Sequence, residues 1–268
     1  EVAKSQAVLA DHVSVLWLTP LMDRLFVEGP GARRRFLDGL VFGSDPAHAG
    51  RVKAYDHALR ERMRLLRDGS KDLGWLASLE DTMATRGVAV AAARLDVTRR
   101  LGVQLAADTG AFPGAAIEVA GPVESWLGDG PALAAEDRFR AVLAGARGSD
   151  AAEGRTTIGP HKSELMVRHL GNGQAAALCS TGEQKALLIA LVLGSARMRA
   201  QERGCAPMLL LDEIAAHLDS HRLDALFDEI IGLGAQVWMT GTDSSLFKPL
   251  AGRAQFFNVA EATVTAVL

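Results

Sequence analysis

The stretch PMLLLDE, residues 207–213, decides the fold class of this chain. Residues 207–211 contain no polar side chain, which is typical of a parallel β-strand that is covered on both faces. Ligands bind at the carboxyl ends of such strands, and here Asp212 and Glu213 follow directly. The first carboxylate of such a pair can hold Mg²⁺, and the second can orient or deprotonate an attacking water. Two solvated loop acids are the alternative interpretation.

The residues on either side of this stretch predict an α/β fold. From residue 155 onward, a glycine-rich turn leads into a long apolar helix, an apolar strand, a second helix and another strand. Near the start of the chain, residues 13–18 are largely apolar and partly β-branched, and Thr19-Pro20 ends the run. These residues therefore predict a further buried strand of the same sheet.

A helical section separates these two parts of the sheet. Apolar residues recur at helical spacing in residues 46–68, and a second long helical stretch covers residues 71–107. A short strand at residues 116–119 and a helix at residues 133–146 follow among glycines and prolines. We therefore predict one head domain interrupted by a mostly helical arm, with the head in residues 1–44 and 151–268 and the arm in residues 45–150.

The long apolar helix opens with Ser180-Thr181-Gly182-Glu183-Gln184. Serine is a favourable N-cap residue, and glycine lets another backbone approach closely. Free N–H groups at a helix start attract phosphate oxygens, so this segment is a candidate phosphate contact. A plain helix cap without any ligand is the alternative interpretation.

Three motifs in this order resemble those of ABC-type ATPases. Residues 180–184 resemble the signature motif, although Cys179 stands where leucine is usual, and residues 209–213 and Asp219 resemble the Walker B strand and the D-loop. The resemblance implies that Glu213 is catalytic and that Asp212 contributes to catalysis as a ligand of Mg²⁺. It also implies that residues 180–184 contact an ATP held by the partner subunit of an ATP-dependent homodimer.

Longer matches resemble the RecF family of bacterial DNA-repair ATPases. They are LTP at 18–20, MDRLF at 22–26, RRRFLD at 33–38, GPHK at 159–162 and QVWMT at 236–240. The resemblance spans nearly the whole chain. It implies a cytoplasmic protein of DNA replication, recombination, repair and the SOS response, which binds ATP and double-stranded or gapped DNA. With its partners RecO and RecR, it would load RecA at single-strand gaps.

The sequence departs from this pattern in its phosphate-binding residues. No G-x-x-x-x-G-K-[ST] loop occurs in the 268 residues; in the family this loop lies upstream, so we expect a partial P-loop head truncated before Glu1. The parent protein is then a slow ATPase, and this chain alone is inactive. Leu21 stands where a polar Q-loop residue is expected, and Thr242 is our candidate for the switch that contacts the γ-phosphate.

The charge distribution adds a local signal for DNA. The net charge is -3, so no global positive field attracts nucleic acid, but residues 51–67 carry six basic side chains against two acidic ones. Arg60 and Arg64 are the candidate phosphate contacts of this helix. A solvated helix with internal ion pairs is an equally good interpretation. His161, after a Gly-Pro pair, is either a ligand contact or a structural histidine.

Other functions stay open at this stage. The chain could be a catalytically inactive module that binds DNA or a partner protein, or the nucleotide-binding subunit of another ABC ATPase. Transporter subunits usually carry proline after the acidic pair, where this chain has Ile214. The longest apolar run, residues 186–194, is much shorter than the roughly 20 residues of a membrane helix, and the two cysteines lack metal-ligand spacing. We expect no membrane contact.

Overall fold

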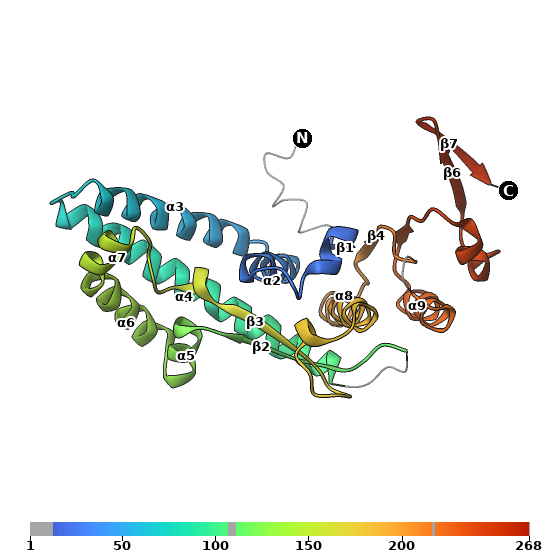
Figure 1. Ribbon diagram of the computed structural model, residues 1–268, viewed down its shortest axis with the longest axis horizontal. Coiled ribbons are helices and arrows are strands. Elements are labelled where there is room, and N and C mark those ends of the chain that lie inside the picture. Colours follow the sequence, from blue (N-terminus) through green and yellow to red (C-terminus); the bar gives the residue numbers. More distant parts are fainter. Residues whose placement is uncertain (1–12, 107–110, 216–217, 268) are drawn as a thin grey trace.

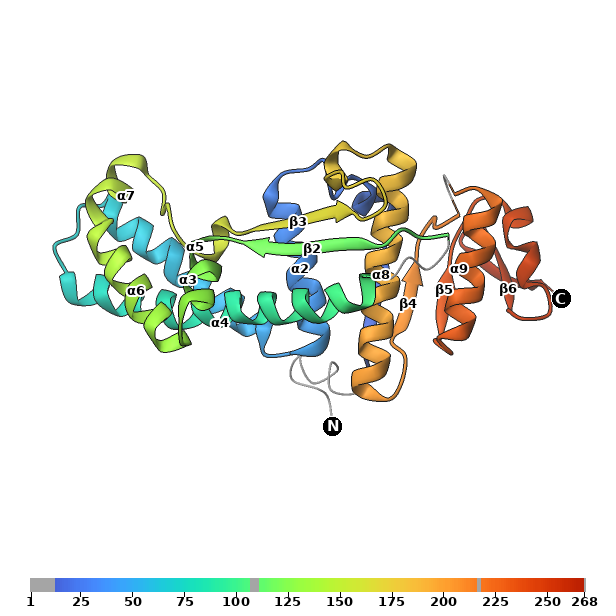
Figure 2. The same ribbon diagram turned by 90° about the horizontal axis from the view of Figure 1, so that it is seen from below.

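The computed structural model describes residues 13–106, 111–215 and 218–267. The described part is elongated, with a helical arm at one end and a β-hairpin at the other, on either side of a small sheet (Figure 1). A view turned by 90° shows the same order along the long axis (Figure 2). None of the described helices is long and apolar enough to cross a membrane.

The sheet consists of three parallel strands, as expected of an α/β protein. These are β1 (Val15–Leu18), β4 (Met208–Leu211) and β5 (Val237–Met239), in the order β1-β4-β5. The two predicted strands at residues 13–18 and 207–211 therefore pair directly, as β1 and β4.

 Leu18 pairs with Leu211 across 193 positions of sequence, and this interval contains the helical arm. The carboxyl ends of all three strands lie at one edge of the sheet, next to the acidic pair.

Helix α8 (Thr181–Arg203) covers one face of this sheet. Its residues from Gln184 to Ala196 are buried all round, as the apolar sequence predicts, and Leu18 and Leu211 belong to the same core cluster. The opposite face carries Trp17, Leu210 and Trp238, which are 51%, 39% and 54% exposed. Helix α9 (Ser220–Gly232) follows β4 and packs its buried side chains into the α8 cluster.

The arm contains the predicted helical hairpin. It is formed by α3 (His48–Arg67) and α4 (Leu73–Leu105), and α2 (Pro30–Ser44) joins it to the sheet. The predicted helix at 133–146 is α6 (Ala132–Gly145). Two further helices, α5 (Pro122–Asp129) and α7 (Arg147–Glu153), were not expected; α5 begins with a proline at its first position, where proline favours a helix.

A long antiparallel pair crosses from the arm to the head. Strand β2 (Ala115–Ala120) contains the predicted strand at 116–119 and pairs with β3 (Glu164–His169). Helix α4 contributes Met83 and Val88 to the arm cluster but Leu101 to the head cluster, so the two cores share this helix. The domain boundaries at residues 44 and 150 stay predictions.

Short elements complete the described chain. The 3-10 helices are η1 (Pro20–Arg24), η2 (Pro160–Lys162), η3 (Ala176–Leu178) and η4 (Ser244–Leu250). The terminal hairpin consists of β6 (Phe256–Ala260) and β7 (Thr263–Val267). Trp238 of β5 stacks on Phe257 with ring centroids 6.5 Å apart, which connects this hairpin with the sheet.

Candidate functional site

The acidic pair lies where β4 ends. The backbone N–H of Asp212 donates to the carbonyl of Leu18 (2.8 Å), which continues the β1–β4 ladder by one residue. Glu213 then turns the chain with a φ of +50°, a left-handed conformation that is uncommon for residues other than glycine. Asp212 is exposed and Glu213 is half-buried, so both carboxylates are accessible to a ligand.

Thr240 holds this pair in place. Its hydroxyl donates to Asp212 Oδ1 (2.5 Å) and accepts from the backbone N–H of Glu213 (3.0 Å). The N–H of Thr240 donates to the carbonyl of Leu211 (3.0 Å), so the β4–β5 pairing fixes the position of the threonine. Thr242, the candidate switch residue from the sequence, makes no hydrogen bond to the pair in the described residues, and its role stays a prediction. The signal for Thr240 was its position directly after β5.

The signature residues form the start of α8. Ser180 is the N-cap, and a capping box joins its hydroxyl to the N–H of Glu183 (3.3 Å) and its own N–H to Glu183 Oε2 (2.8 Å). Hydrogen bonds from the N–H and hydroxyl of Ser180 lower the pKa of Glu183. The buried Gln184 donates to the carbonyl of Cys179 (2.9 Å). Glu183 and Gln184 thus shape the turn, while Ser180 and Thr181 are exposed.

Asp219 and the signature residues lie on either side of one arginine, Arg222. Its carboxylate caps α9 by accepting from the N–H of Arg222 (2.8 Å), and it lies 3.8 Å from the guanidinium of the same residue. A Cβ atom built on Gly182 would lie 3.8 Å from Arg222 Nη1. The start of α8 and the start of α9 are therefore neighbours. Residues 216 and 217 of the predicted D-loop lie outside the described residues.

A buried ion pair connects α8 with the segment after β1. Lys185 is 3% exposed, and its ammonium donates to both carboxylate oxygens of Asp23 (2.7 and 2.9 Å). Leu21, in the position expected for the Q-loop, is 85% exposed beside this contact. Sequence reasoning did not identify the pair, because neither residue has a local signal for a partner 162 positions away.

The candidate DNA-contacting arginines differ in their surroundings. Arg64 is engaged by Glu61 (2.7 Å) and lies 6.0 Å from the ring of Trp75. Arg60 is exposed and lines a hollow between α2 and α3. Of these two arginines, Arg60 lines the hollow, and its side chain makes no ion pair in the described residues.

His161 is held by hydrogen bonds to other parts of the protein. Its Nε2 lies 3.0 Å from the carbonyl of Thr156, which can only accept, so Nε2 carries the proton and Nδ1 accepts from the hydroxyl of Tyr55 (2.6 Å). Burial raises the pKa of Tyr55, which keeps this hydroxyl protonated, and burial lowers the pKa of His161. Both ring nitrogens are thus satisfied by the neutral histidine.

Comparisons with known proteins identify the family. No protein-family model matches the chain. The DNA replication and repair protein RecF of Mesorhizobium japonicum is 50% identical over 265 residues, which cover 98% of this chain and 70% of the relative. The RecF protein of Brucella abortus is 48% identical over 268 residues, with 99% and 70% covered. This chain belongs to the RecF family.

Solved RecF structures share the fold. The recombination mediator RecF with ATPrS in the RecFOR pathway has a TM-score of 0.83 at 18% identity, covering 99% of this chain and 71% of that one. The corresponding RecF–ATP structure has a TM-score of 0.76 at 18% identity, covering 96% and 68%. The predicted α/β head with a helical arm is therefore confirmed as the RecF fold.

Proposed function

We propose that this chain supplies the signature, Walker B and D-loop residues of a RecF-type ATPase that works as an ATP-dependent homodimer in DNA replication and repair. The observation that supports this most is the hydrogen-bonded group of Asp212, Glu213 and Thr240 at the carboxyl edge of a parallel sheet. ATP-bound RecF structures with the same fold support ATP as the ligand.

The acidic pair fits a magnesium–nucleotide site. Mg²⁺ commonly keeps several waters and binds through one or two carboxylates plus substrate phosphates. No group of three or more metal-ligating side chains occurs in the described residues, so Asp212 is the protein ligand in this proposal. When bound, the ion would neutralise phosphate charge. Glu213, held by its backbone N–H, orients the attacking water.

The start of α8 would contact the γ-phosphate of a nucleotide on the other subunit. Ser180 and Thr181 are exposed, and Gly182 leaves space for a ligand next to the free N–H groups of the helix. Asp219 and Arg222 lie beside this surface, where a second subunit would meet it. The homodimer thus places one signature opposite each acidic pair.

The cellular role is proposed from the relatives. Their name and the RecFOR pathway support a cytoplasmic protein that binds double-stranded or gapped DNA and acts with RecO and RecR. We also propose the division into a head (residues 1–44 and 151–268) and an arm (residues 45–150).

Hydrolysis assays test the proposal. We define the extended protein as this chain preceded by the upstream segment that carries the phosphate-binding loop in RecF proteins. The chain alone should show no Mg²⁺-dependent ATPase activity, because the loop that positions the phosphates is not in its sequence. The extended protein should hydrolyse ATP slowly, and Glu213→Gln should abolish this while prolonging the ATP-bound dimer. Normal hydrolysis by Glu213→Gln would contradict the Walker B assignment.

A catalytically inactive binding module is the second candidate function. It is favoured by the lack of a G-x-x-x-x-G-K-[ST] loop in the 268 residues. An ATP titration of the extended protein separates the two candidates: saturable binding supports the ATPase, and no binding supports the module.

A further inference from the structure

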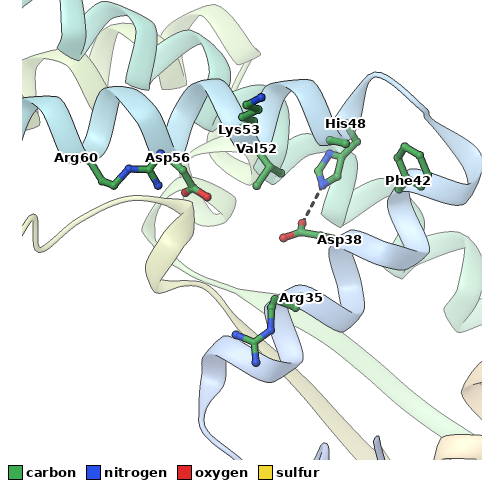
Figure 3. A pocket seen from close by; sticks show the side chains of 9 residues that line it. Arg35, Asp38, Phe42, His48, Val52, Lys53, Asp56 and Arg60 are labelled. Atoms are coloured by element: carbon green, nitrogen blue, oxygen red, sulfur yellow. Dashed lines mark hydrogen bonds and ion pairs between the residues drawn. The ribbon is translucent and has the colours of Figure 1, made fainter. Parts of the chain in front are cut away.

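We propose that the hollow between α2 and α3 is a contact site for the phosphates of duplex DNA. The inference rests on the proposed DNA-binding function and assigns it to a particular place. The hollow has a volume of about 390 Å³. Figure 3 shows it between residues of α2 and residues of α3.

Helical spacing places the charged residues around this hollow. Arg35 and Asp38 lie three positions apart on α2, and Lys53, Asp56 and Arg60 follow the same i, i+3, i+7 pattern on α3. Residues with this spacing share one helix face. Two facing helix surfaces thus bring together cations that are 25 positions apart in sequence, from Arg35 to Arg60.

The cations are available to a ligand. Arg35, Lys53 and Arg60 are exposed and make no ion pair or hydrogen bond in the described part of the chain. Their neighbours differ: Arg33 is engaged by Glu164 (2.6 Å), and Arg34 donates to the carbonyl of Ser163 (2.9 Å). Within the arginine triplet, therefore, Arg35 is the one left to contact a ligand.

The carboxylates of the hollow do not cancel this charge. Asp38 accepts two hydrogen bonds from Arg94 (2.8 Å each) and one from His48 (2.8 Å), shown in Figure 3 for His48. Although burial opposes it, these bonds lower the pKa of Asp38. Asp38 is therefore already neutralised by Arg94. Asp56 interacts electrostatically with Arg60, so the three cations of the hollow face one unneutralised carboxylate.

Duplex DNA is the phosphate ligand that fits these features best. A net-acidic chain needs a local cationic surface to bind a polyanion, and phosphate contacts supply most sequence-independent affinity. A single free phosphate would use the same side chains. The two sources differ in their salt dependence, because only DNA releases condensed counterions in proportion to the phosphates contacted.

The test measures the duplex affinity of the extended protein, with ATP present, as a function of salt concentration. The double variant Arg35→Ala/Arg60→Ala should reduce the slope of log K against log salt by about 2, since each lost phosphate contact reduces it by about 1. Arg86→Ala is the matched control: Arg86 is exposed on α4, outside the hollow, and makes no ion pair in the described residues. It should leave the slope unchanged.

Every other outcome overturns the inference. If the extended protein binds duplex with ATP and the double variant behaves like Arg86→Ala, the hollow is not the site, although the proposed DNA binding stands. If the extended protein binds no duplex with ATP, DNA binding itself fails. Displacement of the duplex by orthophosphate, or by an acidic peptide of equal charge, at the same concentration would reassign the hollow to another anion.

Discussion

The hydroxyl of Thr240 lies 2.5 Å from Asp212 Oδ1 and donates a hydrogen bond to it. Through the same oxygen, Thr240 accepts from the N–H of Glu213 (3.0 Å). One side chain from β5 therefore fixes both the carboxylate that would bind Mg²⁺ and the backbone of the residue that would activate water.

Thr240→Val should lower ATP hydrolysis by the extended protein by about 10- to 100-fold. A hydrogen bond to a charged group contributes about 1.5–3 kcal/mol, and valine retains the shape of threonine without the hydroxyl. Single-turnover hydrolysis and ATP affinity should be measured separately, and affinity should change less. Thr242→Val is the control. A large loss of activity in Thr242→Val with normal activity in Thr240→Val would contradict this role of Thr240 and support Thr242 as the switch.

Arg62→Met should destabilise the arm by about 3–5 kcal/mol, because it leaves the fully buried carboxylate of Asp150 without its cation. Arg62 is fully buried and donates to Glu80 (3.0 Å) and Asp150 (2.7 Å). Urea unfolding measures the loss. Arg64→Met removes an exposed pair with Glu61 and an exposed contact with an aromatic ring, so it should cost about 1 kcal/mol or less. Equal losses in the two variants would contradict the structural role of Arg62.

The folded chain should lose stability as the pH falls below about 6.5, the ordinary pKa of histidine. Burial lowers the pKa of His161, so the unfolded chain takes up the proton first, and the loss levels off below the lowered pKa. Thermal unfolding from about pH 7.5 to about pH 5 measures this. His161→Gln, which cannot titrate, should show a smaller decrease over this range; an equal decrease would assign the effect to other groups.

Local signals in the sequence predicted much of the fold. The apolar run of β4 and the serine cap of α8 are fixed by neighbouring residues, so they were found without the structure. The contact of Thr240 with Asp212 was missed because it depends on the register between β4 and β5. Arg60 and Arg64 were equal candidates in the sequence. The ion pair of Arg64 with Glu61 lies within α3, but the hollow that Arg60 lines depends on the packing of α2 against α3.

The division of the core was harder to predict for the same reason. Helix α4 was expected as part of the arm, yet its Leu101 packs in the head cluster and its Met83 in the arm cluster. A helical pattern shows which face is buried but not which partner buries it. The pairing of β2 with β3 is likewise a long-range contact that no local pattern specifies.

The central claim is that the start of α8 acts on a nucleotide held by the other subunit. Ser180→Arg places bulk at the exposed phosphate contact and removes a cap worth about 1 kcal/mol, which should not unfold the head. In the extended protein it should leave ATP binding by the monomer nearly intact while blocking dimerisation and hydrolysis.

Mixing two inactive variants tests this claim most directly. A heterodimer of Ser180→Arg with Glu213→Gln has one composite site with both lesions and one with neither. We predict that ATP hydrolysis by this mixture recovers part of the activity that each homodimer lacks. No recovery, with heterodimers shown to form, would mean that the site lies within one chain and would contradict the account.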